Sequence, residues 1–546
     1  MSEACLAAAK SALVGVANGD NLASAICAAM EAAVAVPVAR HLEETVDLTA
    51  LQETVDTLGT NLQGTMDGLN TLLLLYGGAL VFLMHGGFAM LEAGAIRSKN
   101  AMNILLQTIM DAACSALMWY FVGFAFAFGI GDKPNKFIGN AMFALKDIDT
   151  HNTGSGTGKW IDWFFQWAFA ATAVTIPAGA VAERFNFNAY LGYSMFIGGW
   201  VYPVIAHWVW CIEGWLGYGV LEPFIKAGMI DFAGSGVIHM TGGLAGLIGA
   251  IMVGPRLGRF DADGKPVDMP GHSAILVVLG TVLLWFGWYG FNPASVLLIN
   301  SSAYAIVCGR AAVCTTLAGA AGGVACLVYG FARHRGWDLV GLCNGILCGF
   351  VAVTACPHVI YPWAAIICGL VAGLWFEFLC WLLLKLKIDD PLSAGPMHFG
   401  CGMWGVFFTG LFARQQYIME YYVHAPSANG DLSKPYPWGA FYKGYNADGE
   451  LVASDGKLLA SQIVGILVII GWVGGMMVPF FGIFKFFGAL RIPPEEEEMG
   501  LDRSKHGGSA YNGHAAGNVH GLSPNAPGTD VMRNSSPSAK VIPVTA

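Results

Sequence analysis

The sequence predicts an all-α, polytopic membrane protein. Of its 546 residues, 55% are hydrophobic and only 12% are charged, whereas charged residues make up about a quarter of an ordinary soluble protein. A membrane-spanning helix needs about 20 mostly apolar residues, and we count eleven such stretches. They begin near residues 70, 103, 160, 189, 232, 272, 303, 338, 361, 395 and 459.

Basic residues in the connecting turns indicate how the spans are oriented. Arg97, Arg184, Arg256, Arg333 and Lys385 all follow odd-numbered spans. Because positively charged turns stay on the cytoplasmic side, these turns are expected to be cytoplasmic. An odd number of spans then places the N-terminus outside the cell and the C-terminus in the cytoplasm.

Three regions follow from these spans: an extracellular N-terminal extension (1–69), a membrane domain (70–490) and a polar cytoplasmic tail (491–546) that is expected to be partly disordered. Within the extension, side chains spaced alternately by three and four residues suggest a short coiled coil. They are Leu48, Leu51, Val55, Leu58, Leu62, Thr65 and Leu69. Nearby glycines weaken helix formation, so an amphipathic helix packed on the membrane domain is the alternative.

Two histidines, His239 and His398, each interrupt an otherwise apolar span. An ionisable side chain at membrane depth is costly unless it faces a pore or a partner, so the pair predicts an internal polar path. For either residue alone, a hydrogen bond to a neighbouring helix is the alternative. Two imidazoles without a third ligand do not make a catalytic zinc site, so we expect neither an enzyme nor a metal or other cofactor. The net charge of -9 argues against a nucleic-acid partner.

Six segments, in order along the chain, resemble the ammonium transporter (Amt/Mep/Rh) family. They are GGFAMLEAGAIRSKNAMNILLQ from Gly86, WAFAATAVTIPAGAVAERFNF from Trp167, DFAGSGVIHMTGG from Asp231, FGWYGFNPAS from Phe286, CNGILCGFVAVTA from Cys343 and HFGCGMWGVFFTGLFA from His398. The resemblance covers residues 70 to 511. The tail sequence GLDRSKHGG is similar to the plant and algal type.

This resemblance implies a homotrimer with one pore in each subunit, built from two inverted five-helix repeats plus an eleventh helix. His239 and His398 then lie on equivalent helices, the fifth and the tenth. The implied function is ammonium transport: the cation loses a proton, and ammonia crosses an apolar pore while the two histidines relay the proton. Potassium has no neutral form and is rejected. A sensor of the same fold that signals through its tail is the alternative.

The resemblance also implies roles for pore aromatics. Trp210, Ser295 and Phe169 recruit the cation at the outer mouth, the indole by cation–π attraction. Phe169 and Phe291 form a gate, and Trp288 lines the pore wall. For Trp210, a membrane-interface aromatic is the alternative, and for the two phenylalanines the alternative is simple helix packing.

Carboxylates and the tail complete the expected site. Asp231 joins the histidines, either steadying the cation or merely capping the fifth span. Asp389 and Asp390 are interpreted as caps at the cytoplasmic end. Ser504 stands where the plant type carries a phosphorylatable threonine, so a kinase is an expected partner. The other expected partners are ammonium or ammonia, lipids of the plasma membrane and two further copies of the chain.

Overall fold

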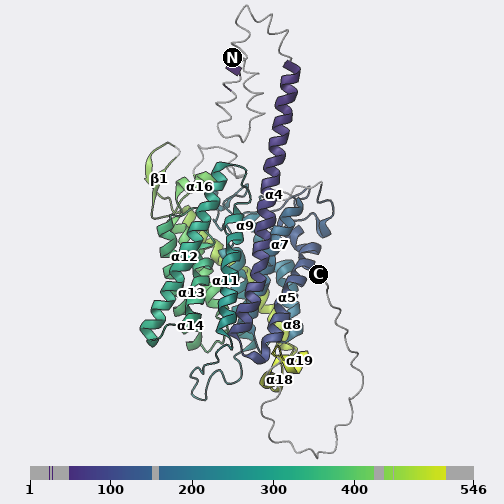
Figure 1. Ribbon diagram of the computed structural model, residues 1–546, viewed down its shortest axis with the longest axis vertical. Helices are drawn as coiled ribbons and strands as arrows, with labels where there is room; N and C mark the ends of the chain where they lie inside the picture. The colour runs from purple at the N-terminus through teal and green to yellow at the C-terminus, as the bar shows by residue number, and fades with distance from the viewer. Residues whose placement is uncertain are drawn as a thin grey trace, which may run out of the picture.

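Apolar helices run side by side through almost all of the protein (Figure 1). The computed structural model describes residues 24, 27–28, 48–149, 159–423, 436–446 and 448–511. The predicted all-α membrane fold is confirmed. Within the described residues, eight helices are long and apolar enough to cross a membrane.

Eleven helical segments correspond in order to the eleven predicted spans. They are α4 (Leu48–Ala95), α5–η2–α6 (Ala101–Met118, Trp119–Gly123, Phe124–Phe128), α7 (Lys159–Val181), α8–η4–α9 (Phe187–Phe196, Ile197–Val201, Tyr202–Trp210), η6–α10 (Ser235–Met240, Thr241–Val253), α11–η7 (Ala274–Phe291, Pro293–Val296), α12 (Ser302–His334), α13 (Leu339–Val353), α14 (Pro362–Lys385), η8–α15 (Gly395–Gly400, Cys401–Phe412) and α17 (Lys457–Phe486).

Shorter elements connect or flank these segments. They are η1 (Ser98–Asn100), η3 (Phe143–Leu145), η5 (Phe224–Lys226), α16 (Gln415–Tyr422), the antiparallel strands β1 (Lys443–Tyr445) and β2 (Leu451–Ala453), α18 (Pro494–Met499) and α19 (Leu501–His506).

Local sequence explains where several helices begin. The side chains of Asn186, Ser273, Ser301 and Asp338 each accept a hydrogen bond from a backbone amide in the first turn of the helix that follows. These amides have no intrahelical partner, so the caps stabilise the starts of α8, α11, α12 and α13. Pro362 starts α14, where its missing N–H costs nothing.

The first helix differs from the expected boundary near residue 70. α4 is one continuous helix that begins at Leu48, so the expected extension and the first span share a single rod. Gly59, Gly64 and Gly68 lower helix propensity but do not interrupt the helix, because glycine, unlike proline, keeps its backbone hydrogen bond.

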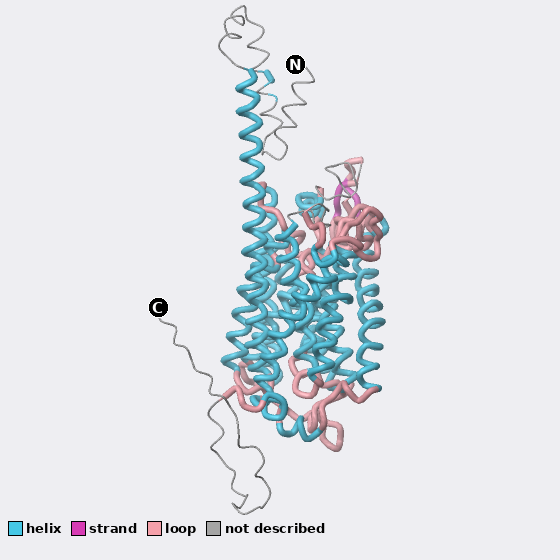
Figure 2. Tube along the Cα trace, turned by 90° about the vertical axis from the view of Figure 1, so that its right-hand side faces the viewer, coloured by secondary structure: helices cyan, strands magenta, loops and turns pink. Residues whose placement is uncertain are grey.

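The packing of the helices follows the expected repeat. The first and sixth segments pack along each other through α4 and α11, and the fifth and tenth meet where α10 contacts η8 and α15 contacts η6. α17 lies against both α10 and α15. The N-terminal part of α4 projects beyond one end of the bundle, which we call the projecting end, and β1 and β2 lie at that end (Figures 1 and 2). Helices α18 and α19 lie at the opposite end, the tail end.

Candidate functional site

Two short π-helices, η6 and η8, carry the histidine pair. His239 lies in η6 and His398 in η8, each eight residues after an aspartate. Asp231 accepts hydrogen bonds from backbone amides three, five and six residues further on, at 3.2, 2.9 and 2.8 Å. Asp390 does the same with amides four and five residues further on, at 3.0 and 2.7 Å. Both carboxylates are therefore helix caps, and the same device starts the fifth and the tenth helical segments, which are equivalent in the expected repeat.

Two glycines, Gly243 and Gly402, allow these helices to touch. Each lies four residues after its histidine. A Cβ atom on Gly243 would lie 2.2 Å from the backbone nitrogen of Phe399, and one on Gly402 would lie 2.5 Å from the carbonyl oxygen of Ser235. Only glycine fits at such a close approach of helix backbones. The two contacts hold the two histidine-bearing turns against each other.

The result is a direct contact between imidazoles. Nδ1 of His239 lies 3.1 Å from Nδ1 of His398, and the rings are nearly parallel with centroids 5.2 Å apart. Exposed fractions of the two residues are 0% and 5%. A hydrogen bond between these atoms requires a proton on one Nδ1 and none on the other. Nε2 of His239 has no hydrogen-bond partner among the described residues.

Aromatic rings continue from the histidines toward the projecting end. Phe291 and Trp288 stack on His239, with centroids 5.6 and 5.5 Å away. Phe169 lies 4.5 Å from Phe291, and Trp210 meets Phe169 edge to face at 6.2 Å. These separations are typical of favourable aromatic pairs. We call this set, together with the two histidines, the aromatic column.

Polar groups at the Trp210 end of the column are oriented by backbone carbonyls. The indole Nε1–H of Trp210 donates to the carbonyl of Asp231 at 2.8 Å, which fixes the ring over Phe169. The Ser295 hydroxyl donates to the carbonyl of Phe291 at 2.6 Å. Since that hydrogen is used, the Ser295 oxygen keeps its lone pairs for accepting a further hydrogen bond. The structure thus brings together every predicted pore residue.

His85 of α4 was missed by the sequence reasoning, although it carries the same signal as the other two histidines. It lies in an apolar span, is 3% exposed, and neither ring nitrogen has a hydrogen-bond partner in the part of the chain that the structure describes. One helical turn further along α4, the Phe88 ring lies 6.2 Å from the His398 ring. A third buried imidazole therefore lies within a turn of a residue that contacts the histidine pair.

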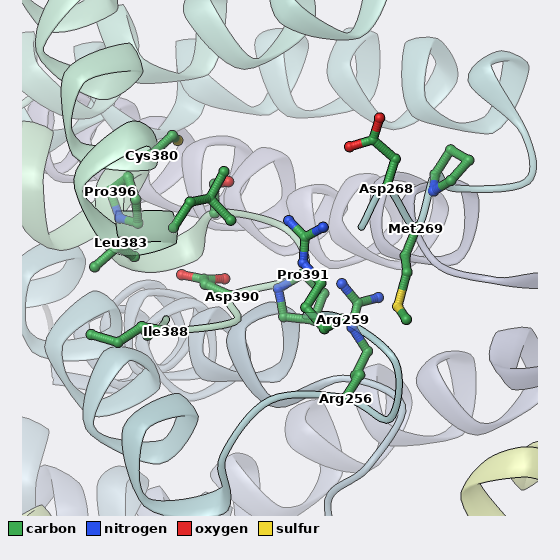
Figure 3. A pocket seen from close by; sticks show the side chains of 13 residues that line it. Arg256, Arg259, Asp268, Met269, Cys380, Leu383, Ile388, Asp390, Pro391 and Pro396 are labelled. Carbon is green, nitrogen blue, oxygen red and sulfur yellow. The ribbon is translucent and has the colours of Figure 1, made fainter. Parts of the chain in front are cut away.

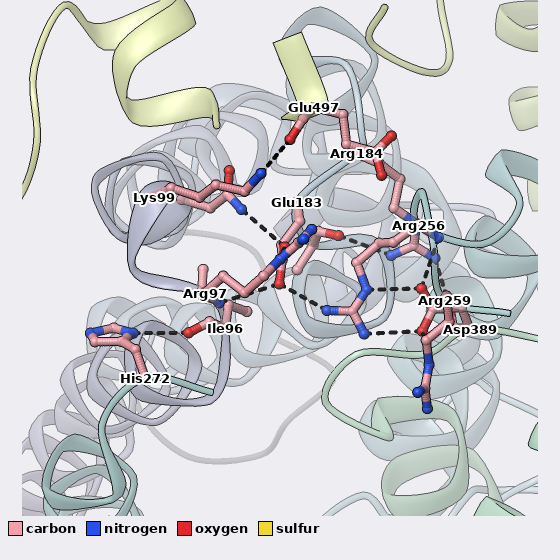
Figure 4. Close-up of polar contacts among 12 residues, drawn as sticks. Ile96, Arg97, Lys99, Glu183, Arg184, Arg256, Arg259, His272, Asp389 and Glu497 are labelled. Atoms are coloured by element: carbon pink, nitrogen blue, oxygen red, sulfur yellow. Dashed lines mark hydrogen bonds and ion pairs between the residues drawn. The ribbon is translucent and has the colours of Figure 1, made fainter. Parts of the chain in front are cut away.

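A charged network closes the tail end of the bundle (Figure 4). The fully buried carboxylate of Glu183 pairs with the guanidinium of Arg97 and with Nη1 of Arg256 at 2.8 Å, and it accepts a hydrogen bond from Asn100 at 3.0 Å. Glu183 lies in the turn after α7, and its partners lie in the turns after α4 and α10. Because an unpaired buried charge is costly, the network holds these three turns together.

Asp389 forms the second half of this network and is not the helix cap that its position suggested. It accepts hydrogen bonds from Nε and Nη2 of Arg256 at 2.8 and 3.1 Å, and from Nε of Arg259 at 3.2 Å. Burial by itself would raise the pKa of Asp389, but the hydrogen bonds from Arg256 and the charges of Arg184 and Arg256 lower it to about 2. Burial lowers the pKa of Arg184 to about 10, which leaves it charged at neutral pH.

A cavity of about 390 Å³ lies beside this network (Figure 3). Arg256, Arg259, Asp390 and Pro396 are among the residues that line it. The two guanidinium groups already pair with Asp389, and the Asp390 carboxylate accepts hydrogen bonds from backbone amides. Asp268, which also lines the cavity, is exposed. No group of three His, Cys, Asp or Glu side chains that could bind a metal is found in the described part of the chain.

The start of the tail docks on the turn before α5. The Asp502 carboxylate accepts hydrogen bonds from the backbone amides of Met102 and Asn103, both at 2.9 Å, and so caps α5 from outside. The backbone amide of Leu501 donates to Asn100 at 2.9 Å. Ser504 lies on the same short helix, α19, and its hydroxyl is buried with no hydrogen-bond partner within the described ranges of the chain.

A many-helix membrane bundle in which two capped helices meet through paired imidazoles is typical of polytopic transporters. Residues 72–511 match the family model described as Ammonium Transporter Family. Among similar proteins, Ammonium transporter 1 member 3 of Solanum lycopersicum is 46% identical over 454 residues, covering 82% of this chain and 94% of that protein. Ammonium transporter 1 member 1 of Arabidopsis thaliana is 45% identical over 438 residues, covering 77% and 81%.

Solved structures with a similar fold include an Amt protein and a Mep2 protein. A protein titled Sensor Amt Protein superposes with a TM-score of 0.69 at 32% identity, covering 81% of this chain and 99% of that one. Mep2 of Saccharomyces cerevisiae gives a TM-score of 0.66 at 28% identity, covering 78% and 88%. The chain belongs to the ammonium transporter family, so its substrate is ammonium and it is a transporter rather than an enzyme.

Proposed function

We propose that the aromatic column carries ammonium as separate ammonia and proton. Ammonium is recruited at the projecting end by the face of Trp210 and the lone pairs of Ser295, through cation–π attraction and a hydrogen bond. Phe169 and Phe291 lie directly beneath and act as a gate that the substrate must displace. Trp288 forms the wall beside His239.

The proton step rests on the 3.1 Å contact between the histidine Nδ1 atoms. Nε2 of His239, which has no hydrogen-bond partner among the residues that the structure describes, accepts a proton from ammonium and leaves ammonia. His239 then passes its Nδ1 proton to Nδ1 of His398, and His398 releases the proton from its own Nε2. Imidazole suits this relay because its protonated and neutral forms are both accessible near neutral pH.

This division explains selectivity in physical terms. Ammonium and potassium have the same charge and similar size, and stripping either of water is expensive. Only ammonium can enter a dry column as a neutral molecule after giving up a proton. The carboxylate of Asp231 contributes indirectly, because it caps η6 and so sets the position of His239.

The surroundings of this pore follow from the same proposal. The protein is a homotrimer of the plasma membrane, with the projecting end outside the cell and the tail end in the cytoplasm. That orientation puts the basic network of Arg97, Arg184 and Arg256 on the side where positive turns are retained.

Regulation is proposed at Ser504. A phosphate on its buried hydroxyl would add nearly two negative charges two residues from Asp502. Although Arg503 and Lys505 offset part of this repulsion, the phosphate does not fit while α19 is docked. The docking of Asp502 on α5 would then be lost, and the pore would close.

Currents recorded from oocytes that express His239→Ala or His398→Ala test the relay. We expect loss of ammonium current or loss of potassium exclusion in both variants, at normal surface abundance. His272→Ala, which removes a histidine outside the column, serves as the control. Ammonium currents and potassium exclusion equal to wild type in both pore variants would refute the relay.

A further inference from the structure

The projecting part of α4 is too long to belong to the membrane. At 1.5 Å per residue, a helix of 48 residues is about 72 Å long, more than twice the roughly 30 Å hydrocarbon core of a bilayer. Residues 48–69 account for about 33 Å of that length. They extend away from the bundle of described helices as a rod (Figures 1 and 2).

Such a rod is poorly suited to stand alone in water. Its sequence holds three glycines and five threonines within 22 residues, all weak helix formers. A Cβ atom on Gly59, Gly64 or Gly68 would meet no atom within 4 Å, so no described part of the chain packs there. Single helices of this length are marginal even with favourable sequences, so a packing partner is needed.

One face of the rod is apolar and keeps the spacing of a coiled coil. Leu51, Leu58, Leu62 and Leu69 are 44%, 67%, 41% and 45% exposed. At the same alternation of three and four residues, the stripe continues on the open face of the bundle as Leu72, which is 61% exposed. In the membrane such leucines can face lipid, but outside it they are left in water.

The placement of charge identifies the partner as another copy of the same chain. With Leu51 and Leu58 at position d of a heptad, Glu53, Asp56 and Asp67 all fall on positions b and f, the outer side of a coiled coil. Neutral residues occupy positions e and g, which flank the seam. They are Gln52, Thr54, Gly59, Asn61, Met66 and Gly68.

Identical parallel chains bring like charges together at e and g, so a helix meant to pair with itself must keep those positions neutral or self-complementary. No lysine or arginine lies between residues 48 and 70 to pair with an acidic or basic partner of another kind. We infer that residues 48–69 of three subunits form a parallel coiled-coil stalk at the projecting end. The number of strands rests on the proposed homotrimer.

Site-directed disulfide cross-linking of the full-length protein tests the stalk. Leu58→Cys places a thiol in the seam, and Thr60→Cys places one at position f on the outside. After mild oxidation of membranes, non-reducing gels should show a covalent dimer for Leu58→Cys. At most about two thirds of the chains should run as dimer, because one disulfide joins two chains of a trimer and the third thiol has no partner. Thr60→Cys should stay at the wild-type background, at least fivefold lower.

Light scattering of the same proteins in detergent separates the stalk from the assembly of the membrane domain. The stalk is refuted if the protein is a trimer in detergent but Leu58→Cys forms no covalent dimer. That result is expected if other residues of the same chain cover the apolar stripe. Equal cross-linking at positions 58 and 60 also overturns the stalk. A monomer in detergent contradicts the proposed trimer and the stalk together.

Discussion

Replacing Gly243 with alanine probes whether the pore depends on the close approach of η8 and α10. The added methyl carbon would lie 2.2 Å from the backbone nitrogen of Phe399 and 2.8 Å from the carbonyl carbon of His398. Ordinary contacts begin near 3.4 Å, so the helices must separate by about 1.2 Å. The two histidine Nδ1 atoms are 3.1 Å apart, and a separation increased by this movement exceeds the range of a hydrogen bond.

The expected cost has two parts. Overpacking of this kind destabilises a protein by about 1–3 kcal/mol, which lowers the melting temperature without preventing folding. A hydrogen bond to a charged group contributes about 1.5–3 kcal/mol. If the imidazole contact is lost while a proton passes through it, the conduction rate should fall roughly ten- to hundredfold. We therefore expect ammonium current to fall at least tenfold at equal surface abundance.

A matched control is Gly474→Ala, because a Cβ atom at Gly474 in α17 meets nothing within 4 Å. This variant should conduct like wild type and be equally or slightly more stable, since alanine favours a helix over glycine. Oocyte currents normalised to surface protein, with melting curves in detergent, provide the comparison. Wild-type current in Gly243→Ala would show that the imidazole contact is not needed for conduction.

Two further predictions concern the tail end. Asp389→Asn removes a partner of buried Arg256 and should cost about 3–5 kcal/mol in melting experiments, whereas Asp455→Asn, which breaks an exposed pair with Lys457, should cost at most about 1 kcal/mol. Because the pKa of Asp389 is lowered from 3.8 to about 2, its stabilising contribution is complete above pH 4 and is lost as the pH falls toward 2. Over that pH range, Asp389→Asn should lose less stability than the wild type. Ser504→Asp should suppress ammonium current at unchanged surface abundance while Ser504→Ala stays active; full current in Ser504→Asp would exclude this residue as the switch.

The spans were predictable because each is a local property of composition. Ten of the eleven expected starts lie within three residues of the start of the observed helix. A change from polar to apolar sequence and capping residues such as Ser273 and Asp338 mark where these helices begin. The exception is α4, whose start was expected near residue 70. Polarity ends a membrane span but does not end a helix, and between residues 48 and 70 no proline stops it.

The sequence by itself determined the membrane class of the fold and the order of its helices, and it identified the two histidines as the candidate functional centre, because apolar runs and an ionisable group within them are visible without any neighbour. Only the tertiary structure decided that His239 and His398 touch through Nδ1, and that Gly243 and Gly402 permit this contact. Likewise, Asp389 and Asp390 are adjacent in sequence, yet one pairs with Arg256 and the other caps η8. These outcomes depend on which groups distant parts of the chain bring near, and that information lies in the packing of helices rather than in any local pattern.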